Sequence, residues 1–559
     1  MAWCHPILFQ RVRAAHSERK KNIVVIDPRR TDSVAIADLH LPLKPGSDVL
    51  LWNGLLNYLK QQGHLDNQPS ELTDGLDDAL AQVAELSIET VATGCELSPD
   101  AVLEFYQLFA ANEKVLTAFC MGVNQSSSGS DKASAIINAH LATGRIGKPG
   151  MGPFSLTGQP NAMGGREVGA LANLLASHFD LAKAQDRATV EQFWQAPARI
   201  PEQPGVTASE VAKAIRSGRI KFLWVMSTNP AVSITEASDF IEASQQLDML
   251  VVSDCVNDTA TLRLADVRLP AAGWSEKSGT VTNSERRISR QRALVPAYEQ
   301  AKPDWWALSQ VAQRLGYQGF DYQNEQEIFV EHAKLSNIGP DRAFRLGALA
   351  KLAPQQYDEL EPIQWPVAQN ELKTTQKRLF EKGDTDHSHR RAKLIPLTPR
   401  PPASSADQAF PLLLNTGRIR DQWHTMTRTG LAARLNEHIS EPFLQVHPSD
   451  ANRYNILDDQ LVTVRSARGQ VLLRAQLTDD VRQGEVFAPM HWSIQSKMAQ
   501  VGRLIAGNVD PASKQPEFKI TPVIIEPFAI NAHGQWLCEE ALFETLKPQL
   551  ESFDYFSYR

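Results

Sequence analysis

The sequence predicts two doubly wound α/β domains followed by a β-barrel domain. Up to about residue 380, short apolar strands alternate with amphipathic helices, which is the pattern of α/β folds. A charged and Pro-rich segment, 381–407, follows, and beyond it short strands succeed one another at the spacing of a closed barrel. Because 559 residues exceed one hydrophobic core, we expect domains at 1–160, 161–380 and 408–559.

The first α/β domain is expected to begin with a helix at 6–16 and a strand that ends at Asp27. The next expected elements are a short strand in "LHLPLKPGSD", a helix from about Ser47, a buried strand in "KVLTAFCMGVNQ" and a helix in "DKASAIINAHLATGRIG". An alternating α/β unit should place a strand before its first helix, and none precedes residue 6. We therefore expect this domain to lack its first strand and the chain to be truncated.

The second α/β domain is expected around two further apolar strands, "IKFLWVMSTNP" and "DMLVVSDCVND". Each of these strands ends in polar residues. In doubly wound folds, ligands bind at the carboxyl ends of parallel strands, so these ends are candidate binding sites.

The segment 381–407 is interpreted as an exposed linker that carries His387 and His389. A solvated connection explains these two histidines better than a metal site does. The barrel strands are expected in "FPLLLNTG", "FLQVHP", "LVTVRSARGQVLLRAQL", "GEVFAPMHW" and "FKITPVIIEP".

Composition excludes several classes of protein. The net charge of -7 argues against a nucleic-acid partner, because binding to phosphate needs a basic surface. No apolar run reaches the ~20 residues that span a bilayer, and the first residues do not resemble a secretory signal, so we expect a cytoplasmic protein without membrane contact. The five cysteines show no paired spacing, so no metal ligand is predicted.

One stretch, "LLNTGRIRDQWHTMTRTG" at 413–430, combines four cations with a Trp directly after an apolar strand. A core segment would not contain so many cations, and a solvated loop would not need Trp423. This composition indicates an extended anionic ligand. The phosphate motifs GxGxxG and GxxxxGK[ST] are absent, so ordinary NAD or ATP binding is not expected.

Six motifs together carry a family resemblance. They are "VVIDPRRT…ADLHLPLKPGSD", "MGVNQ", "GKPGMGPFSLTGQPNAMGGREVG", "SDCVNDTATLRLADVRLPAAGWSEKSGTVTNSERR", "NTGRIRDQWHTMTRTG" and "NVDPASKQPEFK". In this order, over nearly the whole chain, they resemble the molybdopterin oxidoreductases of the dimethyl-sulfoxide-reductase superfamily, and in particular assimilatory nitrate reductase catalytic subunits. The resemblance implies a double-psi-type barrel, a molybdenum bis(molybdopterin guanine dinucleotide) cofactor and reduction of nitrate to nitrite. A non-catalytic molybdopterin-binding remnant and a formate-dehydrogenase-like enzyme are the alternatives.

The resemblance also implies which residues contact the cofactor, and most of them follow strands. The expected contacts are Ala2, Trp3, Cys4, Asp27, Pro28, Arg29, Arg30, Gly46, Ser47, Asp48, Met121, Gln125, Asn229, Ser253, Asp254, Lys277, Asp304, Thr416, Gly417, Arg418, Trp423, His424, Thr425, Asn508 and Lys519. Carboxylates such as Asp27 and Asp48 suit guanine or ribose, and arginines suit phosphate. Taken alone, Asp27 to Arg30 fit an Asp-Pro turn with solvated arginines equally well, and Lys277 fits an exposed lysine better.

Substrate discrimination is expected in "GQPNAMGGREVG", a loop that the family places beside the metal. There Arg166 would hold an oxyanion such as nitrate at the floor of a cleft reached from all three domains, and Met163 would line the pocket. Without the resemblance, Arg166 fits a surface salt bridge and Met163 fits the core. Related formate dehydrogenases carry a different loop at this point, which favours nitrate.

The family's [4Fe–4S] cysteines, its electron-relaying Lys and its molybdenum-ligating Cys belong to a region that precedes the part resembled here. We therefore expect a [4Fe–4S] cluster in the full-length family but none ligated by this chain, and Cys4 is a poor metal ligand. The resemblance implies an electron donor such as ferredoxin, flavodoxin or an NAD(P)H-linked reductase subunit.

Overall fold

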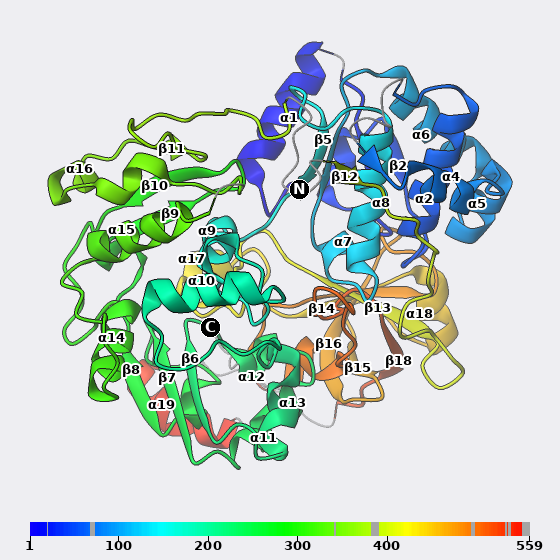
Figure 1. The fold of residues 1–559 in the computed structure, drawn as a ribbon. Helices are drawn as coiled ribbons and strands as arrows, with labels where there is room; N and C mark the ends of the chain where they lie inside the picture. The colour runs from blue at the N-terminus through cyan, green and yellow to red at the C-terminus, as the bar shows by residue number, and fades with distance from the viewer. Residues whose placement is uncertain are drawn as a thin grey trace.

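A computed structural model describes residues 1–19, 21–66, 73–339, 342–381, 391–493, 498–530, 534 and 538–550. Figure 1 shows three regions: the blue and cyan first α/β region, the green second region, and the orange barrel that lies against both. Among the described residues, no helix is long and apolar enough to cross a membrane.

The first region builds its core around one helix. Its elements are α1 (Pro6–Arg19), β1 (Val24–Ile26), η1 (Asp32–Ile36), β2 (Leu39–Leu41), α2 (Asp48–Gln61), β3 (Thr73–Asp74), α4 (Leu76–Val83), α5 (Ile88–Cys95), α6 (Pro99–Ala111), β4 (Leu116–Phe119), α7 (Met121–Asn124), α8 (Gly129–Ala142) and β5 (Gly152–Ser155). Leu51, Leu55 and Leu59 recur every four residues on α2 and are fully buried. This spacing places them on one helix face, and each contributes about 1.5–3 kcal/mol through burial.

The strands of the first region form two separate parallel pairs, β1 with β2 and β4 with β5, and not one doubly wound sheet. The expectation of a buried strand at β4 is wrong, because its residues alternate between exposed and half-buried and Leu116 is 57% exposed. Among the described residues β4 pairs only with β5, so its other edge has no strand to cover it.

The second region contains a parallel sheet and an antiparallel one. Its elements are α9 (Ala162–Glu167), η2 (Ala176–His178), α10 (Ala184–Trp194), η3 (Ala208–Glu210), α11 (Val211–Arg216), β6 (Phe222–Met226), α12 (Pro230–Ser233), α13 (Ala237–Ser244), β7 (Met249–Asp254), η4 (Leu262–Leu264), β8 (Val267–Pro270), η5 (Trp274–Glu276), β9 (Gly279–Thr282), β10 (Arg287–Gln291), α14 (Asp304–Arg314), α15 (Glu325–Ser336), η6 (Gly347–Lys351), α16 (Pro354–Asp358) and β11 (Ile363–Gln364). The parallel sheet β6-β7-β8 contains both expected strands, and the antiparallel sheet β11-β10-β9 is an addition that the sequence pattern did not indicate.

The expected barrel is confirmed as a closed six-stranded sheet in the order β13-β17-β14-β16-β15-β18. The elements after residue 400 are β13 (Leu412–Gly417), η7 (Thr429–Leu431), α17 (Ala433–Asn436), β14 (Phe443–Val446), α18 (Pro448–Tyr454), β15 (Leu461–Arg465), β16 (Gln470–Leu477), β17 (Glu485–Pro489), η9 (Val501–Leu504), β18 (Thr521–Pro527) and α19 (Glu540–Leu550). Strand β13 pairs in parallel with β17 and antiparallel with β18. Leu412, Leu414 and Val523 lie within the barrel core.

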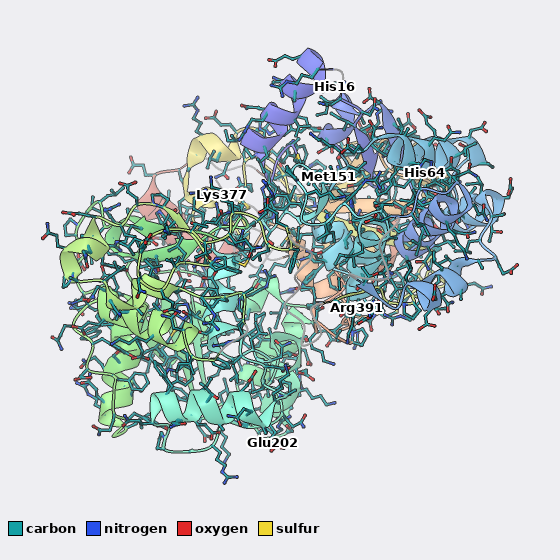
Figure 2. The ribbon with its side chains drawn as sticks, turned by 45° about the horizontal axis from the view of Figure 1, so that its top comes forward. His16, His64, Met151, Glu202, Lys377 and Arg391 are labelled. Carbon is teal, nitrogen blue, oxygen red and sulfur yellow. The ribbon has the colours of Figure 1, made fainter. Side chains whose placement is uncertain are left out.

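The described part of the expected linker is not an open connection. Its strand β12 (Ala392–Lys393) pairs in parallel with β3, and Leu394 and Leu397 are buried. Asn138 donates to the carbonyl of Ile395 over 2.8 Å. In Figure 2, Arg391 lies against the first region, where its guanidinium pairs with Asp74 at 2.8 Å. His387 and His389 lie outside the described residues.

Candidate cofactor site at the junction of three regions

The turn after β1 connects the first region to the barrel. The Asp27 carboxylate accepts a 3.0 Å hydrogen bond from the Arg29 amide, and burial raises the pKa of this carboxyl. The Arg29 guanidinium lies 3.8 Å above the ring of Phe487 and donates to Gln445 over 3.0 Å. The Arg29 guanidinium therefore binds the barrel as well as facing the junction. An arginine that served only to bind phosphate would not make these contacts with the barrel.

Lys519 lies near Asp27 of this turn. Its ammonium donates to the Thr416 carbonyl, and burial lowers its pKa to about 8 against the opposing effect of Asp27. Cys4 and Cys120 also lie close enough to Lys519 to influence its pKa. The junction thus collects residues that lie hundreds of positions apart in the sequence.

The first residues of the chain line the same side of the junction. The Ala2 amide donates to Ser33 over 3.1 Å, and the Trp3 indole donates to Asp32 over 2.6 Å. The Cys120 thiol donates to the Leu156 carbonyl over 2.6 Å. The Cys120 thiol thereby has a position fixed by a protein contact.

We call residues 416–425 the junction loop. The Arg418 guanidinium lies 4.3 Å from the centroid of the Trp423 ring. The rings of Trp423 and His424 are in contact, with their centroids 4.7 Å apart. Burial, and then the charge of Arg418, lower the pKa of His424 to about 4. Arg418 Nη1 is buried without a hydrogen-bond partner among the described atoms. A cation with a buried and unpaired N–H suits an anionic group.

Two glycines, Gly417 and Gly158, allow the close packing of the junction loop. A Cβ at Gly417 would lie 2.7 Å from the Phe487 ring, so only glycine fits. A Cβ at Gly158 would lie 3.3 Å from Arg418 Nη1, which brings the segment before α9 against the junction loop. Helix α9 lies near the middle of Figure 1, where the regions meet.

The second region reaches the junction loop through Asn229. This buried amide donates to the Thr425 hydroxyl over 3.2 Å and accepts from the Thr261 hydroxyl over 2.7 Å. Ser253, by contrast, is committed to the Trp224 indole, which donates to its hydroxyl over 2.8 Å.

Asp254 lines a pocket of about 190 Å³ with Trp274, Lys277 and Arg428. Burial raises the pKa of the Asp254 carboxyl, and the Cys255 amide donates to it over 2.7 Å. Lys277 pairs with Asp304 at 3.2 Å. The pocket combines a carboxylate, two cations and an indole, which together can bind a nucleotide base and its phosphate.

Several expected cofactor contacts are instead bound to protein groups. At Gly46, whose φ is +90°, a Cβ would lie 2.5 Å from Pro402, so the close approach is to that ring. Asp48 pairs with the buried Lys132 at 2.7 Å, because the first turn of α2 faces α8. The Ser47 hydroxyl donates to the Lys44 carbonyl over 2.7 Å, and Asn508 donates to Ser404 over 2.7 Å.

The remaining expected contacts act through their backbones or positions. The Arg30 amide donates to the Asp480 carbonyl over 2.8 Å, and the Gln125 carbonyl accepts from the Phe518 amide over 3.2 Å. Met121 begins α7, and Pro28 lies in the turn after β1. The backbone contacts of Arg30 and Gln125 join the first region to the barrel. They do not indicate whether the side chain of either residue faces a ligand.

The loop that ends in α9 carries both residues expected at the substrate. Met163 is half-buried and packs against the hydrophobic cluster that contains Phe344 and Trp365, and its place in the substrate pocket stays a prediction. Arg166 is exposed on the same short helix, and it lines neither the pocket at Asp254 nor a second pocket at Lys351. Its position at the floor of a cleft stays a prediction.

Glu167 was not predicted from the sequence as a functional residue. This carboxylate is 3% exposed and accepts from the Trp365 indole over 2.7 Å and the Thr282 hydroxyl over 2.8 Å, and burial raises its pKa. It fixes α9 to the second region. Glu167 lies four residues after Met163, so both lie on one face of the helix, and this spacing could have predicted its role from the sequence.

The fold and the polar junction define a class: a multidomain protein that binds a large, anionic cofactor between two α/β regions and a barrel. Comparison with known families agrees, since residues 1–314 match the family "Molybdopterin oxidoreductase" and residues 412–522 match the "Molydopterin dinucleotide binding domain". The chain belongs to the molybdopterin oxidoreductase family.

Two relatives bear on the reaction. A nitrate reductase of Klebsiella oxytoca is 45% identical over 94% of this chain, and the chain spans 60% of that relative's length. An F420-dependent formate dehydrogenase subunit alpha of Methanocaldococcus jannaschii is 33% identical over 93% of this chain, and the chain spans 74% of that relative's length.

The fold has a solved counterpart. Acetylene hydratase from Pelobacter acetylenicus superposes with a TM-score of 0.70 over 93% of this chain and 76% of its own, at 14% identity. This likeness confirms the mixed α/β and barrel architecture.

Proposed function

We propose that the chain is a nitrate reductase catalytic subunit or a fragment of one: it binds a molybdenum bis(molybdopterin guanine dinucleotide) cofactor, within a double-psi-type barrel architecture and in the cytoplasm, and the intact enzyme reduces nitrate to nitrite. The observation that carries the proposal is Arg418, a half-buried cation whose buried Nη1 has no hydrogen-bond partner in the described part of the chain, in a loop where three regions meet. The 45% identity to a nitrate reductase supports nitrate as the substrate. The reduction consumes two electrons and two protons and yields nitrite and water, and a donor such as ferredoxin, flavodoxin or an NAD(P)H-linked subunit would supply the electrons.

The residues at the junction fit the proposed cofactor. Arg418 and Lys519 offer cations to its phosphates, and the Asp254 pocket offers a carboxylate and the Trp274 indole to one guanine. The Asp27 carboxyl, held in place by the Arg29 amide, offers an acceptor to the other. When bound, the cofactor would supply the two-electron chemistry, while the protein orients it and excludes water.

Arg166 is proposed to bind the substrate anion. Its helix, α9, is fixed by Glu167 to Thr282 and Trp365, which leaves the exposed guanidinium on a rigid support. A guanidinium binds planar oxyanions through two parallel N–H bonds, and nitrate offers that geometry.

Arg166→Ala is expected to weaken nitrate binding by about tenfold or more, because a hydrogen bond to a charged group contributes about 1.5–3 kcal/mol. Calorimetry on the cofactor-loaded chain would measure the nitrate Kd. Arg199→Ala removes another exposed arginine of the same region and serves as the matched control. A Kd unchanged by Arg166→Ala would contradict the proposed role.

The second candidate reaction is formate oxidation, which the 33% identity to a formate dehydrogenase subunit favours. Formate replaces nitrate in the same calorimetric titration. Tighter binding of formate than of nitrate, with the same dependence on Arg166, would select this candidate.

The barrel alone is expected to bind no pterin. Its junction loop supplies cations, but Asp27, Asn229 and Asp254 come from the other regions. Residues 407–559, expressed in a host that makes the cofactor, should purify without pterin, measured by the fluorescence of its oxidised form. Stoichiometric pterin on this fragment, at the level of the 559-residue chain, would contradict the shared site.

A further inference from the structure

A short segment after β17 holds the backbone of the junction loop at four points. The Met490 amide donates to the Gly417 carbonyl over 3.0 Å, and the Ser493 hydroxyl donates to the Thr425 carbonyl over 2.9 Å. Between these two contacts, His491 binds the loop with both ring nitrogens. The loop therefore depends on the segment 490–493 for its shape.

His491 bridges the two halves of the loop. Its Nε2 accepts from the Ile419 amide over 2.9 Å, and its Nδ1 lies 2.7 Å from the His424 carbonyl. Because Nε2 accepts from an N–H it carries no proton, so Nδ1 carries the proton and donates to the carbonyl. The ring is 0% exposed, and burial lowers its pKa to about 4, so it stays neutral near pH 7.

The loop needs such an anchor because its own backbone is strained. His424 has a φ of 45° and Met426 a φ of 60°, in the left-handed region that non-glycine residues rarely adopt. Such conformations cost of order 1–3 kcal/mol each and persist only when surrounding contacts impose them. His491 binds Ile419 and His424, of which Ile419 directly follows Arg418 and His424 directly follows Trp423.

We propose that His491 is a positioning residue for the cofactor: its neutral ring joins Ile419 to His424 and so fixes the directions of Arg418 and Trp423. This inference rests on the proposed function of the loop, and it adds a residue that does not itself touch the cofactor. The imidazole acts as one donor and one acceptor at a fixed separation, which neither an aliphatic side chain nor an imidazolium provides.

The test compares His491→Leu with His491→Gln in the 559-residue chain. Leucine fills similar space without hydrogen bonds, whereas glutamine offers one acceptor and one donor. His447→Leu is the matched control, since His447 is also a barrel histidine that accepts a backbone N–H, from Ser449 at 3.2 Å. Pterin content and hydrogen exchange of the cofactor-free chain, read by mass spectrometry, are the two measurements.

We expect His491→Leu to speed exchange across 416–425 at least tenfold and to lower retained pterin at least tenfold, with most of both effects recovered in His491→Gln and absent in His447→Leu. Parental pterin content in His491→Leu would overturn the proposal. If His491→Leu does not fold, the parent chain decides: its Ile419 amide, whose acceptor is the His491 ring, must exchange slowly, and exchange at the rate of an exposed loop refutes the anchor. Absence of pterin from the parent itself would instead refute the proposed function, while the exchange data still test the anchor.

Discussion

Asp48→Ala is expected to destabilise the chain by about 3–5 kcal/mol, because it leaves Lys132 as an unpaired charge inside the protein. The Lys132 ammonium lies 2.7 Å from the Asp48 carboxylate, and the two side chains are 3% and 17% exposed. When one partner of a buried ion pair is removed, the attraction between the two charges is lost, but the desolvation cost of the remaining charge persists. Urea unfolding at pH 7, followed by tryptophan fluorescence, would measure the loss.

A double variant separates this effect from loss of packing. Asp48→Ala combined with Lys132→Met should recover most of the lost stability, because the methionine fills the same space without a charge. Glu526→Ala is the control, since it breaks a surface pair with Arg465 in which both side chains are about half exposed, and it should cost at most about 1 kcal/mol. A cost for Asp48→Ala as small as that of the control would show that Lys132 is not enclosed.

The ion pair also gives Asp48 a protein partner that the sequence did not indicate. From the sequence, Asp48 was a free acceptor at the start of a helix, because nothing near it suggested a partner. Lys132 lies on α8, and only the packing of α8 against α2 brings the two charges together. The protein partners of a polar side chain cannot be predicted from local sequence when a distant helix supplies them.

The barrel was predictable because its strands alternate short apolar runs with turn residues, a pattern that local sequence records directly. The antiparallel sheet β11-β10-β9 was missed for the converse reason. Strand β10 contains four polar or charged residues in five and β11 has two residues, so neither shows an apolar run. Strand β4 shows an apolar run but remains half exposed, since exposure depends on neighbouring strands that the run does not encode.

The candidate site was predictable where strand ends carry polar residues. Asp27, Asn229 and the junction loop all follow strands, and the structure brings the loop into contact with Asn229 and with Lys519. His491 was missed because it lies within a run that predicts only a strand, "GEVFAPMHW". Its role depends on two backbone atoms some 70 residues earlier, and no local pattern records such a contact.

Acid is expected to destabilise the protein through its buried neutral histidines, and His140 is the clearest case. The ring is 0% exposed, its Nε2 lies 2.8 Å from the Thr117 hydroxyl, and burial lowers its pKa from 6.5 to about 3. The unfolded chain binds a proton below pH 6.5 while the folded chain does not, so the contribution of His140 to stability is complete above pH 6.5 and falls as the pH drops towards 3. Between pH 7 and pH 4 the loss is about 3 kcal/mol, at about 1.4 kcal/mol per pH unit.

His140→Gln isolates this effect from the other titrating groups. Glutamine stays neutral and can keep the contact with Thr117, so the variant should lose about 3 kcal/mol less stability than the parent between pH 7 and pH 4. The comparison is needed because Glu485 opposes it: burial raises the pKa of that carboxyl to about 7, which favours the folded chain as the pH falls. Urea midpoints at both pH values give the difference, with His64→Gln as the control, an exposed histidine at the edge of the first region in Figure 2. Equal losses in the parent and in His140→Gln would show that the folded protein accommodates a charged His140.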